Sequence, residues 1–324
     1  MRIALGQFRA LDERALRFAR QIGASGVLVN TPDGFSAYPW PVDELVALRE
    51  RVERHGLRLE AIENVPLEAY RDAILGLEGR DRCVADYRAT IRNLGAAGID
   101  MLGLHWMADG VARTEVAAPG RGGARVSAFD RTRWTDDAPV FGRTFDDEAL
   151  WASLGAFLAD VLPVAEEAGV TIALHPDDPP VPMLRGVARV LRSVDALERA
   201  MALRPSARLG LDLCLGTVSE MGADPVAAIR RLGGGGHIAY VHFRDVQGAV
   251  PTFSECFLGE GNYDPAAAMR ALLEVGFDGF VIDDHVPLLD EDPGIAEGWA
   301  YHGHAHGTGY LQGVLAGVAA EAVA

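Results

Sequence analysis

The 324-residue sequence predicts a (β/α)8 TIM barrel that forms a single domain over residues 1–324. Two observations lead to this fold class. First, apolar runs that read as strands recur eight times, and each is followed by a stretch with helical periodicity. Second, these runs are continuously apolar rather than alternating, as expected for parallel strands covered on both faces. A TIM barrel is the simplest architecture with this order of elements.

The units follow one another along the whole chain. Strands are expected at 2–8, 25–30, 57–63, 100–106, 171–176, 208–214, 238–246 and 277–285. The helices that follow them are expected near 11–22, 43–56, 81–97, 147–168, 186–201, 223–232, 264–275 and 303–322. A doubly wound open sheet is the competing architecture, but no Gly-rich dinucleotide fingerprint follows a strand. The Gly run at 233–236 precedes a strand and reads as a turn.

Composition excludes several classes of partner. The formal net charge of −16 argues against nucleic-acid binding, which needs a basic face. No apolar run of about 18 residues predicts a membrane span, and the first residues lack the apolar core of a signal peptide. The 3 cysteines form no C-x-x-C pair, so no disulfide framework is expected. These features predict a cytoplasmic protein with neither a nucleic-acid nor a membrane partner.

Four potential metal ligands stand at or near the ends of the last four predicted strands. They are His175, Cys214, His242 and Asp284. Parallel strands of a barrel bring these ends together over one mouth. Taken singly, a buried histidine or cysteine is more often a core residue. Together, two imidazoles, a thiolate and a carboxylate suit a first-row divalent ion such as Mn²⁺, Fe²⁺, Co²⁺ or Zn²⁺.

Other polar residues crowd the same face, including Asp177, Arg244, Glu255, His285 and Tyr301. Arg244 can hold a substrate carboxylate bidentately, or it can form a salt bridge with a neighbouring acid at the mouth. The three histidines at 302–306 open a predicted helix, which scatters them around its axis and argues against a second metal site there.

Two long loops are expected to leave this face. Residues 107–146, between the fourth strand and helix, are polar, Gly-rich and carry six arginines, among them Arg113. Residues 286–302 join the last strand to the last helix. Long loops are either functional or surface excursions. The first loop is therefore either a mobile excursion or a lid whose arginines offset the acidic mouth.

Several segments resemble D-mannonate dehydratase, a metal-dependent sugar-acid dehydratase on a xylose-isomerase-like TIM barrel. They are ENVPLEAY (63–70), GRDRCVADYRATIRNLGAAGI (79–99), ALHPDDPPVPMLRG (173–186), LDLCLG (211–216), YVHFRDV (240–246), FSE (253–255) and DDH (283–285). They fall in the family's order and span most of the chain. The HPDDPP string is the most specific of them.

The resemblance implies roles for individual residues. The metal ligands would be His175, Cys214, His242 and Asp284, with Mn²⁺ favoured over Fe²⁺, Co²⁺ and Zn²⁺. By the same resemblance, His285 and Tyr301 would be catalytic, moving protons. The substrate contacts expected at the mouth are Arg244, Asp177, His105 and Glu255. The family also implies a homo-oligomer, with a dimer expected.

The chain departs from the family pattern at substrate-side positions. The family's Arg-Pro-Asp-His-Gly run is replaced here by the residues 282–286, Ile-Asp-Asp-His-Val, so the arginine is absent. The segment after the fourth strand reads LHWMADG, with His105. A family histidine is lost near Leu258, and a Gly-Arg pair is replaced by Ala305 and His306. The metal ligands are thus retained while the substrate pocket differs.

These features give a leading hypothesis and two alternatives. The leading one is a hydro-lyase that removes water from D-mannonate or a related aldonate to give a 2-keto-3-deoxy acid. The first alternative is a metal-dependent isomerase or epimerase of a keto-sugar or polyol on the same scaffold. The second is a barrel that binds metal or sugar acid without catalysis. Fold alone does not decide among them.

Overall fold

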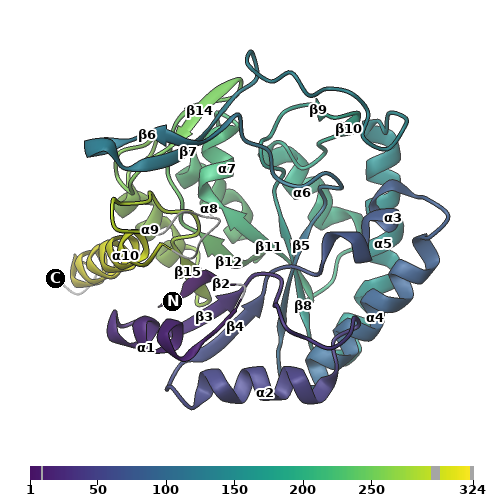
Figure 1. Ribbon diagram of the computed structural model, residues 1–324, viewed down its shortest axis with the longest axis horizontal. Helices are drawn as coiled ribbons and strands as arrows, with labels where there is room; N and C mark the ends of the chain where they lie inside the picture. Colours follow the sequence, from purple (N-terminus) through teal and green to yellow (C-terminus); the bar gives the residue numbers. More distant parts are fainter. Residues whose placement is uncertain (9, 293–299, 322–324) are drawn as a thin grey trace.

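Nine parallel strands form a barrel in the computed structural model, which describes residues 1–8, 10–292 and 300–321. They are β1 (Arg2–Ile3), β2 (Leu5–Phe8), β3 (Gly26–Val29), β4 (Arg58–Ile62), β5 (Met101–His105), β8 (Thr171–His175), β11 (Leu209–Cys214), β12 (Ile238–His242) and β15 (Phe280–Ile282). Because β1 pairs with β15 and β2 with β3, the first segment closes the ring. The predicted TIM barrel is confirmed (Figure 1).

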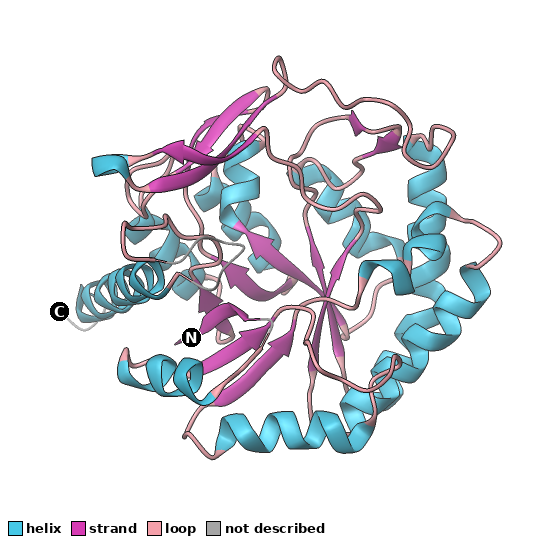
Figure 2. Cartoon of the chain, viewed as in Figure 1, coloured by secondary structure: helices cyan, strands magenta, loops and turns pink. Residues whose placement is uncertain are grey.

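The helices lie outside the strands, as Figure 2 shows. The long ones are α1 (Glu13–Gln21), α2 (Val42–Glu53), α4 (Arg80–Ala96), α5 (Asp147–Ala168), α6 (Val194–Leu203), α8 (Pro225–Gly234), α9 (Pro265–Glu274) and α10 (Tyr301–Glu321). Two short helices, α3 (Arg71–Leu75) and α7 (Leu215–Glu220), join them. Side chains of Asp12, Asp146, Ser193, Asp224 and Asp264 accept N–H groups of the first turns, which fixes five of the starts.

One helix prediction is wrong in its bounds, and one short helix was not predicted. The helix expected at 186–201 begins only at Val194, because Ser193 caps it and residues 187–188 form β10. This short strand pairs with β9 (Met183–Leu184) in a hairpin. The helix α7 is the second difference. It begins directly after Cys214, in a stretch for which no element was predicted. The predicted end of the last helix, residue 322, lies outside the described residues.

The segment 107–146 is not a bare loop. It contains β6 (Glu115–Pro119) and β7 (Arg125–Asp130), which form an antiparallel sheet with β13 (Val246–Ala249) and β14 (Thr252–Glu255). This second sheet lies beside the barrel at the upper left of Figure 1. Buried side chains such as Phe129 and Phe253 give it a small core of its own. The two interpretations of the segment, a mobile excursion and a lid, both stay predictions.

The second predicted loop, 286–302, is described only in part. Residues 293–299 lie outside the described residues, and α10 already begins at Tyr301. The described portion is tied to the hairpin, since the N–H groups and carbonyl oxygens of Arg125 and Leu288 bond to each other at 2.9 Å.

The helix α5 is long and apolar enough to cross a membrane by length and composition alone. Its packing gives it another role. It contacts α4, α3 and β8, and the side chains of Leu154, Phe157 and Leu158 are fully buried. This apolar helix is thus a covering helix of the barrel.

Candidate functional site

Three predicted ligands end three neighbouring strands. His175 is the last residue of β8, Cys214 of β11 and His242 of β12. Cys214 and His242 are directly paired in register. One donor atom from each of the three residues lies within 4.8 Å of the other two. The convergence predicted from strand ends is therefore present, and all three side chains are buried.

The two imidazoles of this group each have a ring nitrogen available to bind a cation. The Nδ1 atom of His175 lies 2.6 Å from the carbonyl oxygen of Pro176, so it carries the proton and leaves the Nε2 lone pair open. Neither ring nitrogen of the buried His242 has a hydrogen-bond partner among the described residues. Burial lowers the pKa of His175, and it lowers that of His242 to about 3, so both rings are neutral. Neutral imidazoles with orphaned nitrogens fit a divalent metal.

Asp284 supplies the carboxylate from the other side. Its Oδ1 atom lies 3.5 Å from Nδ1 of His242 and accepts a hydrogen bond from Gln7 at 2.8 Å. Burial would raise its pKa, but His242, His285 and Arg244 outweigh burial and hold the pKa well below the usual range. Asp284 has a φ of 51°, a left-handed conformation that is uncommon outside glycine. Such strain is typical of functional sites.

His285 is the titratable group at the opening. Its Nδ1 atom lies 2.8 Å from Oε1 of Glu255, and its side chain is 38% exposed. Burial alone would lower the pKa of His285, but the carboxylates of Asp284 and Glu255 raise it to about 9. The ring is therefore protonated at neutral pH, with Nε2 on the side of Asp284, 3.8 Å from Oδ1.

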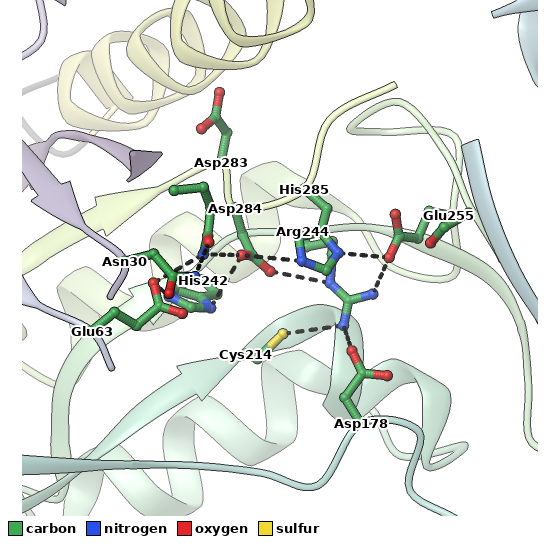
Figure 3. A network of polar contacts seen from close by, with 12 residues as sticks. Asn30, Glu63, Asp178, Cys214, His242, Arg244, Glu255, Asp283, Asp284 and His285 are labelled. Carbon is green, nitrogen blue, oxygen red and sulfur yellow. Dashed lines mark hydrogen bonds and ion pairs between the residues drawn. The ribbon is translucent and has the colours of Figure 1, made fainter. Parts of the chain in front are cut away.

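Arg244 lies at the centre of a buried ion network, which Figure 3 shows. Its guanidinium donates to Glu220 at 2.7 Å, to Glu255 at 2.9 Å and to Asp178 at 3.0 Å. It also reaches the Sγ atom of Cys214 at 3.5 Å. Of the two interpretations of Arg244, the salt bridge to acids at the mouth is therefore present. A direct grip on substrate stays a prediction.

Arg113, from the segment that leads into the hairpin, joins this network. It forms a bidentate salt bridge with Asp178 at 2.5 and 2.8 Å, and it donates a hydrogen bond to Glu255 at 2.9 Å. Sequence reasoning named Arg113 only as one of several loop arginines. The network also includes Glu220 on α7, which no sequence pattern marked, and Asp178, the second aspartate of the HPDDPP string.

His105 and Glu63 border the ligands on the next strands. His105 is opposite His175 in register, and the two rings stack with centroids 4.5 Å apart. Its Nε2 atom lies 3.5 Å from Oε1 of Glu63, whose other oxygen accepts from Gln7. Burial, then Asp284, raises the pKa of Glu63 to about 7. Glu63 opens the ENVPLEAY string, a signal that could have marked it as a site residue.

The structure does not place Asp177 with the ion network around the ligands. Its Oδ2 atom accepts a hydrogen bond from the backbone N–H of Leu191 at 2.6 Å. Among charged groups, Arg189 has the largest effect on the pKa of Asp177. The neighbouring Asp178 faces Arg113 and Arg244 instead. A substrate contact by Asp177 stays a prediction.

Tyr301 lies between two outer helices. Its ring meets Phe18 of α1 edge-on, with centroids 4.8 Å apart, and the guanidinium of Arg14 lies 4.6 Å from the ring centre. Burial raises the pKa of its hydroxyl, Asp12 raises it further and Arg14 lowers it. The structure thus places Tyr301 at the contact of α1 with α10, whereas His285, the other predicted catalytic residue, stands beside the ligands.

Comparison with known proteins fits this geometry. The chain is 29% identical to mannonate dehydratase 2 of Halalkalibacterium halodurans over 97% of this chain and 98% of that protein. It is 30% identical to a mannonate dehydratase of Thermotoga neapolitana over 94% and 93% of the two chains. The crystal structure of mannonate dehydratase from Streptococcus suis superposes with a TM-score of 0.92 at 27% identity, covering 100% of this chain and 95% of that one.

More distant structures share the fold alone. An L-ribulose 3-epimerase superposes with a TM-score of 0.64 at 19% identity, covering 99% of this chain and 97% of that one. Such a likeness does not favour the epimerase alternative. The family profile of D-mannonate dehydratase (UxuA) matches residues 1–141 and 139–323. The chain therefore belongs to the D-mannonate dehydratase family and is a hydro-lyase.

Proposed function

We propose that the protein is a metal-dependent dehydratase that converts D-mannonate or a related aldonate into a 2-keto-3-deoxy acid. The observation that carries this proposal is the convergence of His175, Cys214, His242 and Asp284 beside His285. The first four would hold the cation, and Mn²⁺ is the ion we propose, ahead of Fe²⁺, Co²⁺ and Zn²⁺. Soft and borderline donors together favour such first-row ions over Mg²⁺ or Ca²⁺.

The reaction moves a weakly acidic proton from the carbon beside the carboxylate to a base, and hydroxide departs from the next carbon as water after an acid protonates it. A divalent cation in this site would supply Lewis-acid stabilisation for the negative charge that develops. The chain itself supplies the proton transfers and the orientation of the substrate. Product would leave as an enol that tautomerises to the 2-keto-3-deoxy acid.

His285 is the group that we propose for proton transfer. Its Nδ1 atom is held by Glu255, so Nε2 is the atom left to face a substrate. With a pKa raised to about 9, the ring holds a proton on Nε2 that it can give to a departing hydroxide. Its partial exposure lets a bound sugar acid reach it. A positioned acid of this kind contributes about 10²–10⁴-fold to a rate.

The residues around His285 are the proposed substrate contacts. Glu255 and Arg244 lie in the network behind its ring, and His105 borders the ligands on the other side. Because Glu255 and Asp178 already bind Arg113 and Arg244, a substrate carboxylate would compete with them for these two guanidinium groups. Asp177 would act only indirectly, through its bond to the backbone at Leu191.

The test is a product analysis with purified, Mn²⁺-loaded protein and a panel of aldonic acids. We expect a 2-keto-3-deoxy acid from mannonate or a close epimer, and no product from a His285→Asn variant. Turnover without loss of water would support an isomerase or epimerase instead. Absence of turnover across the panel, with ligand binding retained in His285→Asn, would support a non-catalytic barrel. The homodimer and the cytoplasmic location also stay predictions.

A further inference from the structure

A buried carboxylate lies beneath the proposed metal ligands. Asp212 stands two residues before Cys214 on β11, so both side chains point to the same face of that strand. Asp212 is 0% exposed, and neither of its oxygens has a hydrogen-bond partner among the described residues. Buried polar groups without partners are rare in folded proteins, and each one calls for an explanation.

The imidazole of His242 can donate to this carboxylate, as can the hydroxyl of Tyr240. Its Nε2 atom lies 3.3 Å from Oδ2 of Asp212, while Nδ1 lies 3.5 Å from Oδ1 of Asp284. The ring is thus placed between a deep carboxylate and a carboxylate of the ligand set. Both of its nitrogens lack a hydrogen bond among the described residues, as do both oxygens of Asp212.

A neutral imidazole carries one N–H group and one lone pair. If Nε2 keeps the proton, a small rotation lets it donate to Asp212, and the lone pair of Nδ1 then points toward Asp284. Metal-binding histidines are commonly fixed in this way, by a carboxylate on the nitrogen that does not bind the ion. We propose that Asp212 is a positioning residue that selects the tautomer and the orientation of His242. This inference rests on the proposed metal-dependent function and deepens it.

One other role for the same carboxylate has a geometric basis. Donor atoms of Glu63, His105 and Asp212 lie within 4.8 Å of one another and could hold a second cation. The Nε2 atom of His242 also lies 3.7 Å from Glu63. With the proton on Nε2, the N–H group of His242 would point at that second cation, which is electrostatically unfavourable. The positioning role accounts for the same contacts without this conflict.

The experiment measures Mn²⁺ affinity and stoichiometry in chelator-stripped protein, by competition with a chromogenic chelator and by elemental analysis. We expect about one ion per wild-type chain. Asp212→Leu, which removes the acceptor at similar size, should weaken binding about 10–100-fold. Asp212→Asn keeps an acceptor oxygen and should restore most of the affinity. Asp109→Asn is the matched control, because Asp109 is a buried aspartate paired with Arg189 outside the ligand group.

Circular dichroism establishes that each variant is folded. If Asp212→Leu does not fold, Asp212→Ser takes its place with the same expectation. Unchanged Mn²⁺ affinity in the folded variant would overturn the positioning role and leave the proposed function intact. Two ions per wild-type chain, with one lost in the variant, would overturn it in favour of a second site. A wild-type chain that binds no Mn²⁺ would overturn the proposed metal dependence itself.

Discussion

The Nδ1 atom of His285 lies 2.8 Å from Oε1 of Glu255, and the same oxygen accepts hydrogen bonds from Arg113 and Arg244 at 2.9 Å each. One carboxylate oxygen thus joins the proposed proton donor to both buried arginines. Burial would raise the pKa of Glu255, but His285 and Arg113 hold it well below the usual range. The ionised Glu255 keeps His285 oriented and protonated.

The first prediction concerns this pair. Glu255→Gln should move the alkaline limb of the kcat profile to lower pH, because the lost carboxylate no longer raises the pKa of His285. The shift should be about 1 unit or more, as for other opposite charges in contact. Dehydration assays between about pH 6 and 10 would measure it, around the ordinary pKa of histidine and the raised one. Glu260→Gln is the control, since Glu260 pairs with Arg121 near the surface. An unchanged limb would contradict the role of His285 as the acid.

The second prediction concerns protons released on metal binding. Burial raises the pKa of the Cys214 thiol, whereas burial lowers the pKa values of His175 and His242. At pH 7 the thiol therefore carries a proton and the imidazoles do not. Binding of Mn²⁺ should expel about one proton from Cys214, so apparent affinity should rise about tenfold per pH unit below the thiol pKa.

Calorimetric titration in buffers of different ionisation enthalpy would count these protons. Cys214→Ser should bind more weakly and lose most of the pH dependence, because a serine hydroxyl does not ionise in this range. Affinity that is independent of pH in the wild type would show that Cys214 is not a thiolate ligand.

The third prediction concerns the arginine that the hairpin segment brings to the site. Arg113→Leu leaves Asp178 and Glu255 buried without one of their two arginines. Removing one partner of a buried ion pair typically costs about 3–5 kcal/mol. Urea unfolding should therefore show a clearly lower free energy of unfolding. Arg131→Leu, in the same segment, removes a partly exposed pair with Asp137 and should cost under about 1 kcal/mol. Equal losses in the two variants would argue against the buried network.

The barrel and the ligand group could be predicted from sequence because both depend on local patterns. Continuous apolar runs mark buried parallel strands, and residues at their ends meet at one mouth. His175, Cys214 and His242 stand at those ends, so their convergence follows from the fold. Boundaries were less predictable where a single cap decides them, as Ser193 does for α6.

The ion network could not be predicted in the same way. Arg113 contacts Asp178 and Glu255, which lie 65 and 142 residues away in the sequence. These contacts form because the second sheet holds the Arg113 segment beside the barrel mouth. Its strands are short, and two of them lie in a polar, Gly-rich segment, so the hydrophobic pattern did not reveal them. Adjacent aspartates posed a different problem. Asp177 bonds to the backbone and Asp178 to the arginines, a choice that the loop conformation makes and that periodicity does not reveal.

The last prediction separates catalysis from packing at Tyr301. Family resemblance implies a proton-transfer role, yet the ring packs between α1 and α10 against Phe18 and Arg14. If packing is its main role, Tyr301→Phe keeps the ring and should leave kcat within about twofold, less than the 10²-fold typical of a lost general acid. Tyr301→Ala should lower the free energy of unfolding, because it opens a cavity at the helix contact. Parallel measurement of kcat and urea unfolding distinguishes the two roles. A hundredfold loss of kcat in folded Tyr301→Phe would show that the tyrosine hydroxyl takes part in proton transfer.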